Sequence, residues 1–443
     1  MSDTEEKMDV CNDESCSDDD SVVEDENTTE QCEKEVYIPG KPLEEGEELI
    51  CDQSAYIMLH QARTELPCLS FDIIEDKLGQ NRETFPMTSY IVAGTQGQQN
   101  HANNIVVMKL HNLCKTSNDD EDDDEENDEL SDDEDEIQEP KFAAASIKHQ
   151  GGVNRIRNYN YNGTTLVASW SERGRVNIWD ITEQLQVVDD TQLLNAYNNQ
   201  NKAHSTKPLF TFSGHQNEGF AMDWSRTMSG VLATGDCRRD IHIWKPAENS
   251  WSVDQRPLVG HTDSVEDLQW SPNEREVLAS CSVDRSIRIW DIRSTPNEAC
   301  QLVVKDAHKN DVNVINWNKA EPFILSGGDD GFLHIWDLRS IRNGTPIAAF
   351  KHHLGPVTTV EWNPTDPAVF ASGGEDNQIA LWDLSVEIDE EAPAEQIGDL
   401  PQQLMFIHQG QTNIKELHWH PQLTNVIIST AESGFNIFRT ISC

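Results

Sequence analysis

The chain has 443 residues and a net charge of −46, from 79 acidic and 33 basic side chains. Such a balance repels the phosphates of nucleic acid and attracts strongly basic proteins at close range, so we expect no direct binding of nucleic acid. The ten cysteines form no CxxC pair and no metal-ligand spacing, and no run of about 18 apolar residues indicates a membrane span. We therefore expect an intracellular monomer with reduced thiols that uses no metal or cofactor.

The first 36 residues are acidic and poor in large apolar side chains, with 15 Asp or Glu against 2 Lys. A segment of this composition cannot bury enough surface to offset its ordering entropy, so residues 1–36 are predicted to be a disordered tail. Ser17, Ser21 and Ser131 each have an acidic residue three positions on, which is the pattern of acid-directed phosphorylation. An unmodified, solvated serine explains each position equally well.

Residues 37–82 are expected to hold a helix and a closing strand. Asp52 is a suitable N-cap for a helix over Asp52–Ala62, because four apolar residues fall on one face at helical spacing. These four residues are Ala55, Met58, Leu59 and Ala62. The run Cys68–Ile74 is rich in β-forming residues and is predicted to be a strand.

Residues 83–443 open with predicted strands over 86–96, 103–113 and 141–149. An acidic loop, 118–137, separates the last two, and it should project into water because packing so many carboxylates together has a prohibitive desolvation cost. The loop side chains that we expect to bind a basic partner are Asp119, Asp120, Glu121, Asp122, Asp123, Asp124, Glu125, Glu126, Asp132, Asp133, Glu134, Asp135 and Glu136.

A tryptophan then recurs at intervals of 46 residues, each time at the end of a strand-like frame such as LASCSVDRSIRIWD. The four positions are Trp244, Trp290, Trp336 and Trp382. Two further frames end at Trp179 and at Phe438, where phenylalanine replaces tryptophan. A period near 45 residues with a Trp-Asp ending is typical of the blades of a β-propeller. With one blade before Trp179, the sequence predicts an all-β, seven-bladed WD40 propeller.

Two intervals are longer than the others. From Trp179 to Trp244 there are 65 residues, so 19 extra residues lie around 187–207, and the excess before Phe438 falls in 387–403. The last blade lacks a fourth strand after Ile441. We expect Cys68–Ile74 to supply that strand, which would join the two chain ends and leave no open sheet edge.

A set of His, Ser, Asp and Trp recurs with fixed spacing in three frames. The step from Ser to Asp is four residues and the step from Asp to Trp is six. The three sets are His261, Ser280, Asp284 and Trp290; His308, Ser326, Asp330 and Trp336; and His353, Ser372, Asp376 and Trp382. The same residue types form catalytic triads, but three copies at one spacing favour hydrogen-bond chains that pin each turn to its strands.

Two frames depart from this pattern, since Arg173 and Arg238 occupy the Asp place. Those blades must hold their turns in another way, or they offer a cationic spot on the rim. The sequence also lacks a phosphate-binding glycine loop, an HExxH motif and a GxSxG motif, so it does not predict an enzyme.

Longer stretches are more specific than any single frame: YIPGKPLEEGEEL, CLSFDII, HNLC before an acidic tract, FSGHQNEGFAMDWS, VDQRPLVGHTDSVEDLQWSP, SGGDDG, DLPQQLMFIHQG, KELHWHPQ and SGFNIFRTIS. On these stretches the chain resembles the glutamate-rich WD repeat-containing proteins, which are part of the histone-binding WD-repeat family. The resemblance implies a protein of the nucleus and nucleolus, with the cytoplasm also open. It implies a role in making the large ribosomal subunit, as a dedicated chaperone of ribosomal protein L3, and core-histone binding as a wider family trait.

The resemblance also implies a groove for a partner helix between the N-terminal helix and a loop of the next-to-last blade, here Asp52–Ala62 and Ile388–Phe406. The candidate groove residues are Tyr56, Leu59, Glu390, Glu391, Asp399, Leu400 and Phe406. An equally good interpretation of Leu404 and Phe406 is that they are strand core.

Three binding functions follow from these features. In the first, acidic segments shield a newly made basic ribosomal protein until it reaches pre-ribosomal particles. The second is a histone chaperone at chromatin. The third is a substrate receptor of a cullin-type ubiquitin ligase, suggested by the WDxR patterns that end at Arg293 and Arg339, although such arginines more often pair locally.

Overall fold

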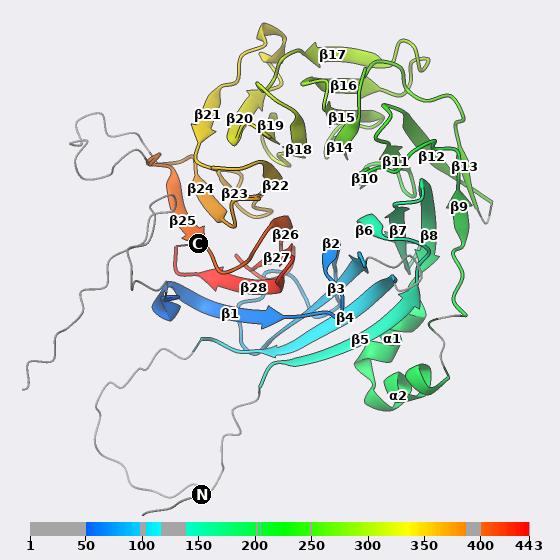
Figure 1. The fold of residues 1–443 in the computed structure, drawn as a ribbon, viewed down its shortest axis with the longest axis vertical. Helices are drawn as coiled ribbons and strands as arrows, with labels where there is room; N and C mark the ends of the chain where they lie inside the picture. Colours follow the sequence, from blue (N-terminus) through cyan, green and yellow to red (C-terminus); the bar gives the residue numbers. More distant parts are fainter. Residues whose placement is uncertain are drawn as a thin grey trace, which may run out of the picture. The chain divides into compact units, whose positions relative to one another are not determined.

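The computed structural model describes residues 50–97, 103–116, 139–200, 203, 205–248, 250–386 and 400–442. Their strands form seven antiparallel four-stranded sheets arranged as blades around a central channel (Figure 1), which confirms the predicted propeller. The first blade consists of β2 (Cys68–Ile74), β3 (Met87–Thr95), β4 (Asn104–Leu113) and β5 (Lys141–Lys148). The second consists of β6 (Val153–Tyr161), β7 (Thr164–Ser171), β8 (Arg175–Asp180) and β9 (Phe210–Phe212).

The middle blades follow the same order from the channel outward. The third consists of β10 (Ala221–Trp224), β11 (Leu232–Gly235), β12 (Ile241–Ala247) and β13 (Ser250–Val253). The fourth consists of β14 (Val265–Trp270), β15 (Val277–Ser282), β16 (Ile287–Asp291) and β17 (Cys300–Val304). The fifth consists of β18 (Val312–Trp317), β19 (Phe323–Gly328), β20 (Phe332–Asp337) and β21 (Ala348–Lys351), with a short 3-10 helix, η3 (Ile341–Asn343).

The sixth blade consists of β22 (Val357–Trp362), β23 (Val369–Gly374), β24 (Ile379–Asp383) and β25 (Leu404–His408). The seventh contains β26 (Ile414–Trp419), β27 (Ile427–Ala431), β28 (Gly434–Thr440) and, as its outermost strand, β1 (Tyr56–Ala62). Because each sheet is packed between two others, side chains on both faces of its second strand are buried, as in β15. Phe438 pairs with Ile427 in the register in which Trp290 pairs with Leu278, so it does occupy the tryptophan place.

The ring closes through β1, which pairs with β28 and so brings the two ends of the chain into one blade (Figure 1). The expected closure was correct in kind, but its strand was wrong. Cys68–Ile74 forms β2, the innermost strand of the first blade. Closure by β1 covers the backbone of β28, which would otherwise be an open edge.

The predicted helix over Asp52–Ala62 is wrong. Asp52 does cap a turn, because its carboxylate accepts a hydrogen bond from Ser54 N at 3.1 Å, but the turn is a 3-10 helix limited to Gln53–Ala55. From Tyr56 the chain is extended, and Tyr56 and Met58 are buried against the seventh blade. Pairing with β28 therefore outweighs a local pattern that fits a helix equally well.

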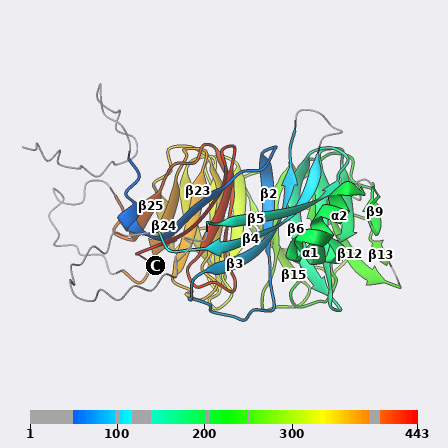
Figure 2. The ribbon, with the colours of Figure 1, turned by 90° about the horizontal axis from the view of Figure 1, so that it is seen from below.

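The extra residues between β8 and β9 form two helices, α1 (Thr182–Asp189) and α2 (Thr191–Asn199). They pack on the outer strands β4 and β5 of the first blade (Figure 2). Val187, Val188 and Tyr197 form a small core with Ala145. The position of the insertion agrees with the sequence prediction, whereas its helical form was not anticipated. No helix in the described part of the chain is long and apolar enough to cross a membrane.

Candidate functional site

The three predicted hydrogen-bond chains are all present. In the fourth blade, His261 lies 2.9 Å from Asp284 and 2.7 Å from Ser280, and the Trp290 indole donates to Ser280 at 2.8 Å. The corresponding distances are 3.0, 2.8 and 2.9 Å for His308, Asp330, Ser326 and Trp336, and 3.1, 2.8 and 3.0 Å for His353, Asp376, Ser372 and Trp382.

The direction of each chain follows from its donors. An indole can only donate, so the serine oxygen accepts from tryptophan and gives its own proton to Nε2 of histidine, whose Nδ1–H then faces the aspartate. Burial would raise the pKa of Asp284, but hydrogen bonds from His261 and from neighbouring groups hold it below its usual value. Ser280 is fully buried and its oxygen is covered by Trp290, so no substrate can reach it. These chains are structural.

A fourth chain, in the third blade, was missed by the sequence reasoning. His215 lies 2.9 Å from Asp236 and 2.8 Å from Thr234, and Trp244 donates to Thr234 at 2.9 Å. Threonine replaces serine, and the aspartate comes two residues before Arg238, which had been assigned to its place. In the second blade, where Arg173 stands, the turn is held in another way: Ser171 donates to the carbonyl of Gln150 at 2.7 Å.

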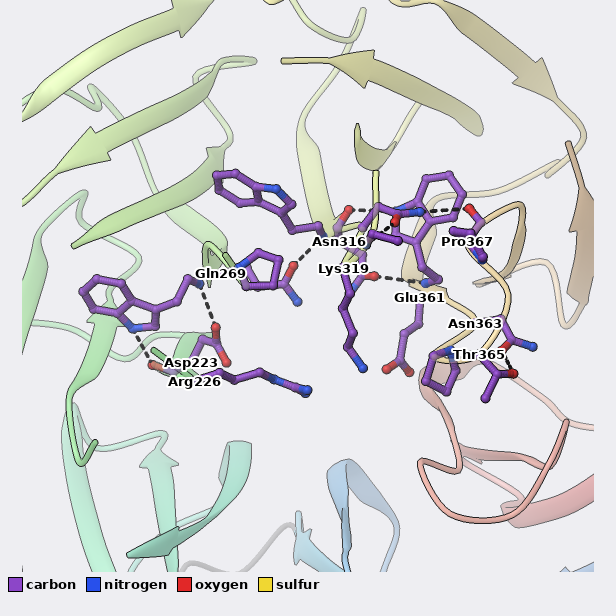
Figure 3. Close-up of a pocket in the computed structure, with 16 residues that line it drawn as sticks. Asp223, Arg226, Gln269, Asn316, Lys319, Glu361, Asn363, Thr365 and Pro367 are labelled. Atoms are coloured by element: carbon purple, nitrogen blue, oxygen red, sulfur yellow. Dashed lines mark hydrogen bonds between the residues drawn. The ribbon is translucent and has the colours of Figure 1, made fainter. Parts of the chain in front are cut away.

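Neighbouring blades are joined at the end of the channel where the innermost strands finish, which we call the exit end. Asp223, Gln269, Asn316 and Glu361 each accept a hydrogen bond from the backbone N–H of the tryptophan that ends the next blade's innermost strand, at 2.7, 2.5, 3.0 and 3.0 Å. Figure 3 shows the first three of these contacts. One polar atom of each side chain is thus used by the fold.

A buried carboxylate ties together the three blades at which the ring begins and ends. Glu416 lies on β26, and its Oε1 pairs with Arg155 at 2.7 Å and with Arg157 at 2.6 Å. Its Oε2 accepts hydrogen bonds from the Ser70 hydroxyl at 2.7 Å and from Phe71 N at 2.9 Å. Because these partners lie on β2 and β6, one side chain links the seventh blade to the first and the second.

The charges around Glu416 are coupled. Burial would raise its pKa, but Arg157 and Arg155 hold it well below the usual range. His418 lies 3.0 Å from Glu361 and 3.6 Å from Glu416. Burial would lower the pKa of His418, but the two carboxylates outweigh burial and raise it to about 10. The channel therefore carries a protonated histidine at neutral pH.

The candidate groove is partly assembled in the structure. The rings of Tyr56 on β1 and Phe406 on β25 meet edge to face with centroids 5.4 Å apart, and the Tyr56 hydroxyl lies 2.8 Å from Nδ1 of His408. Leu59 and Phe406 are half-buried against the same core, and Leu400 is half-buried before β25. Two strands rather than a helix and a loop bring these side chains together. Glu390, Glu391 and Asp399 lie outside the described residues.

The acidic-loop residues Asp119 to Glu136 and the candidate phosphorylation sites Ser17, Ser21 and Ser131 also lie outside the described residues. The residue that precedes the loop is placed, however, because Thr116 N donates to the Ile57 carbonyl at 3.0 Å. His60 contacts the carbonyl of Cys114 at 2.9 Å. The acidic loop therefore leaves the ring beside β1.

Three acidic stretches of sequence are attached at the exit end. Residues 1–49 precede β1, 117–138 follow β4, and 387–399 follow β24; β1 begins, and β4 and β24 finish, at that end, because strands alternate in direction within each blade. Together the stretches hold 40 of the 79 acidic and 3 of the 33 basic residues, and so −37 of the net charge of −46. Strand β1 lies at the centre of this arrangement, since its first residues contact both Thr116 and β25.

Arg293 and Arg339, the ends of the WDxR patterns, pair locally. Each donates to the aspartate two residues earlier, with shortest distances of 2.5 Å to Asp291 and 2.7 Å to Asp337. Within the described part of the chain, no group of three or more His, Cys, Asp or Glu is placed to hold a metal ion.

Comparison with known proteins finds relatives over almost the full length. The chain is 41% identical over 438 residues to ribosome assembly protein rrb1 of Schizosaccharomyces pombe, covering 96% of this chain and 88% of the relative. It is 42% identical over 421 residues to glutamate-rich WD repeat-containing protein 1 of Dictyostelium discoideum, covering 92% and 85%. The chain belongs to the glutamate-rich WD repeat-containing protein family.

Another relative, the protein HEAT STRESS TOLERANT DWD 1 of Arabidopsis thaliana, is 45% identical over 427 residues, covering 91% of this chain and 90% of the relative. Residues 46–114 match the family model that describes the histone-binding protein RBBP4 and a component of the CAF1 complex. The WD domain, G-beta repeat model matches residues 253–291, 299–337 and 344–383. The histone-binding match spans β1 to β4 and so includes one side of the candidate groove.

Proposed function

We propose that the chain is a non-catalytic chaperone of ribosome assembly. It shields a newly made, strongly basic protein of the large subunit, ribosomal protein L3, and delivers it to pre-ribosomal particles. The S. pombe relative is named a ribosome assembly protein, which supports the process. The observation that carries the proposal is the attachment of stretches holding −37 charges at one end of a rigid ring. The choice of L3 rests on the family resemblance.

The proposed mechanism divides the work between two kinds of surface. Acidic stretches neutralise client charges that rRNA later takes over, and such diffuse attraction falls steeply with salt because the Debye length is about 8 Å at physiological ionic strength. The apolar contact between β1 and β25, with Tyr56, Leu59 and Phe406, gives a shaped site next to these attachments. Shape supplies specificity, and charge supplies rapid capture and protection from wrong partners.

The decisive experiment removes the charge of the loop without changing its length. A variant with the acidic residues of 119–136 replaced by Asn and Gln is compared with one in which the same residues are shuffled. We expect the neutral variant to release labelled L3 several-fold faster at low salt, whereas the shuffled variant keeps the native rate and both keep the melting temperature. An unchanged lifetime of the complex in the neutral variant contradicts shielding by this loop.

Histone binding is the second candidate, favoured by the match of residues 46–114 to a histone-binding family. The two functions predict different rankings when L3 and core histones compete for a limiting amount of the chain at physiological salt. We expect L3 to be retained. Displacement of L3 by stoichiometric histones would reverse the order of the two proposals.

We place this activity in the nucleus and nucleolus, where pre-ribosomes assemble, with a cytoplasmic pool for meeting newly made protein. Imaging of the tagged full-length chain tests the location. Exclusion from the nucleus would contradict delivery to pre-ribosomal particles.

A further inference from the structure

A small cavity opens where the channel ends, among the loops that follow the innermost strands of the third to sixth blades. Its volume is about 120 Å³, which is room for about four water molecules at about 30 Å³ each. Figure 3 shows the side chains of Arg226 and Lys319 reaching into this space from two different blades. Neither side chain forms an ion pair with any residue that the structure describes.

Two amide groups complete the donor set. The Oε1 atom of Gln269 accepts from Trp317 N, and Oδ1 of Asn316 accepts from Trp362 N. Because a backbone N–H needs an oxygen as its partner, these contacts fix which end of each amide points away from the fold. The NH₂ groups of Gln269 and Asn316 are therefore left for the cavity that both residues line.

The acceptors of the cavity stand on either side of these donors. Asp223 on the third blade and Glu361 on the sixth each use one oxygen for a tryptophan N–H, and the other oxygen has no hydrogen bond within the described residues. Burial raises the pKa of Asp223 to about 7, so this carboxyl group can also donate near neutral pH. Desolvation, and then the charge of Arg226, lower the pKa of Lys319, as expected when two cations share a site without an anion.

We infer that this cavity is a binding site for a phosphate monoester of a small hydroxyl-bearing molecule, such as a sugar phosphate. Arg226 and Lys319 would form charge-assisted hydrogen bonds to the phosphate, with the amides of Gln269 and Asn316 beside them. Asp223 and Glu361 would accept hydrogen bonds from hydroxyl groups of the ligand. The site lies on the scaffold rather than in the groove, so it does not depend on the proposed chaperone function.

Calorimetric titration of the full-length chain with ribose 5-phosphate at 0.15 M salt tests the site, because at that ionic strength distant charges are screened beyond about 8 Å. We expect saturable binding to one site, at least tenfold weaker in Arg226→Gln and in Lys319→Gln. Lys245→Gln is the matched control, since Lys245 is an exposed lysine outside the cavity, and its affinity should equal that of the native chain.

The competing outcomes are distinct. Absence of saturable binding overturns the proposal, as does equal binding by all variants or an equal loss in Lys245→Gln, which would indicate diffuse attraction. Ribose without phosphate is the final arm, and binding as tight as that of the phosphate ester would show that the anion is not recognised. Circular dichroism of each variant confirms that weaker binding does not come from unfolding.

Discussion

The third to sixth blades and the three blades at the seam have the same four-stranded sheets, but different interactions hold them. In the third to sixth blades a chain of Trp, Ser or Thr, His and Asp lies inside each sheet and repeats almost unchanged. At the seam, between the seventh, first and second blades, the corresponding role passes to Glu416 with its two arginines and to the added strand β1. The repeated blades are each secured from within, and the seam is secured from outside any one blade.

This difference explains where the acidic stretches can be attached. A repeated blade that kept its own hydrogen-bond chain could not exchange a strand without breaking that chain. The seventh blade has Gln411 where the others have histidine, and Phe438 where they have tryptophan. It accepts its outer strand from the other end of the sequence. The acidic stretches thus meet the ring at its least repetitive part.

Removal of β1 should have the largest effect. Deletion of residues 1–62 exposes the edge of β28 and uncovers the seventh blade, whereas deletion of 1–49 leaves β1 in place. Burial of Tyr56 and Met58 alone is worth about 1.5–3 kcal/mol each, so with the ladder hydrogen bonds we expect the longer deletion to cost more than about 5 kcal/mol. Urea unfolding of both deletions checks this, and equal stability of the two would show that the seam closes without β1.

Loss of the Glu416 carboxylate should come next. Glu416→Ala leaves Arg155 and Arg157 buried without their anion, which typically costs about 3–5 kcal/mol. Glu375→Gln is the control, because its pair with Lys415 is half-exposed at 3.5 Å and such pairs are worth about 0–1 kcal/mol. A small loss in both variants would mean that the channel charges are solvated and do not tie the seam.

The hydrogen-bond chains should give a smaller, blade-dependent effect. Ser280→Ala leaves both His261 and Trp290 without a partner, so we expect a loss of about 2–3 kcal/mol. Ser429 of the seventh blade contacts only Gln411, at 2.5 Å, and Ser429→Ala should cost about 1 kcal/mol. Thermal or urea unfolding measures both, and identical losses would remove the distinction between repeated and seam blades.

The same contrast decides what the sequence could predict. The spacing of Ser280, Asp284 and Trp290 is set by the hairpin geometry of one blade, so reading three copies was enough to place every atom pair correctly. The chain with Thr234 and Asp236 was missed because a threonine and a shifted turn preserve the geometry without preserving the spacing. Local repetition thus predicts local structure, and it fails where a neighbouring residue takes over a role.

The seam could not be predicted in this way. Ala55, Met58, Leu59 and Ala62 suit a helix, and only the available edge of β28, more than 370 positions later in the sequence, makes the segment a strand. The groove residues Tyr56 and Phe406 were nevertheless chosen correctly as neighbours, because the family resemblance carried long-range information that periodicity lacks. Charged residues on innermost strands, such as Arg155, Arg157 and Glu416, were the signal that sequence reasoning overlooked.

The smallest expected effect concerns pH at the seam. The folded pKa of His418, about 10, lies above the usual value of 6.5, so its charge stabilises the fold fully below pH 6.5 and this contribution is lost as the pH rises toward 10. The native chain should therefore lose stability between pH 7 and 9 relative to His418→Gln, by at most about 1.4 kcal/mol per pH unit. Urea unfolding at several pH values gives the two slopes. Parallel curves would mean that His418 is neutral in the folded chain, and the seam would then be held by the arginines of Glu416 alone.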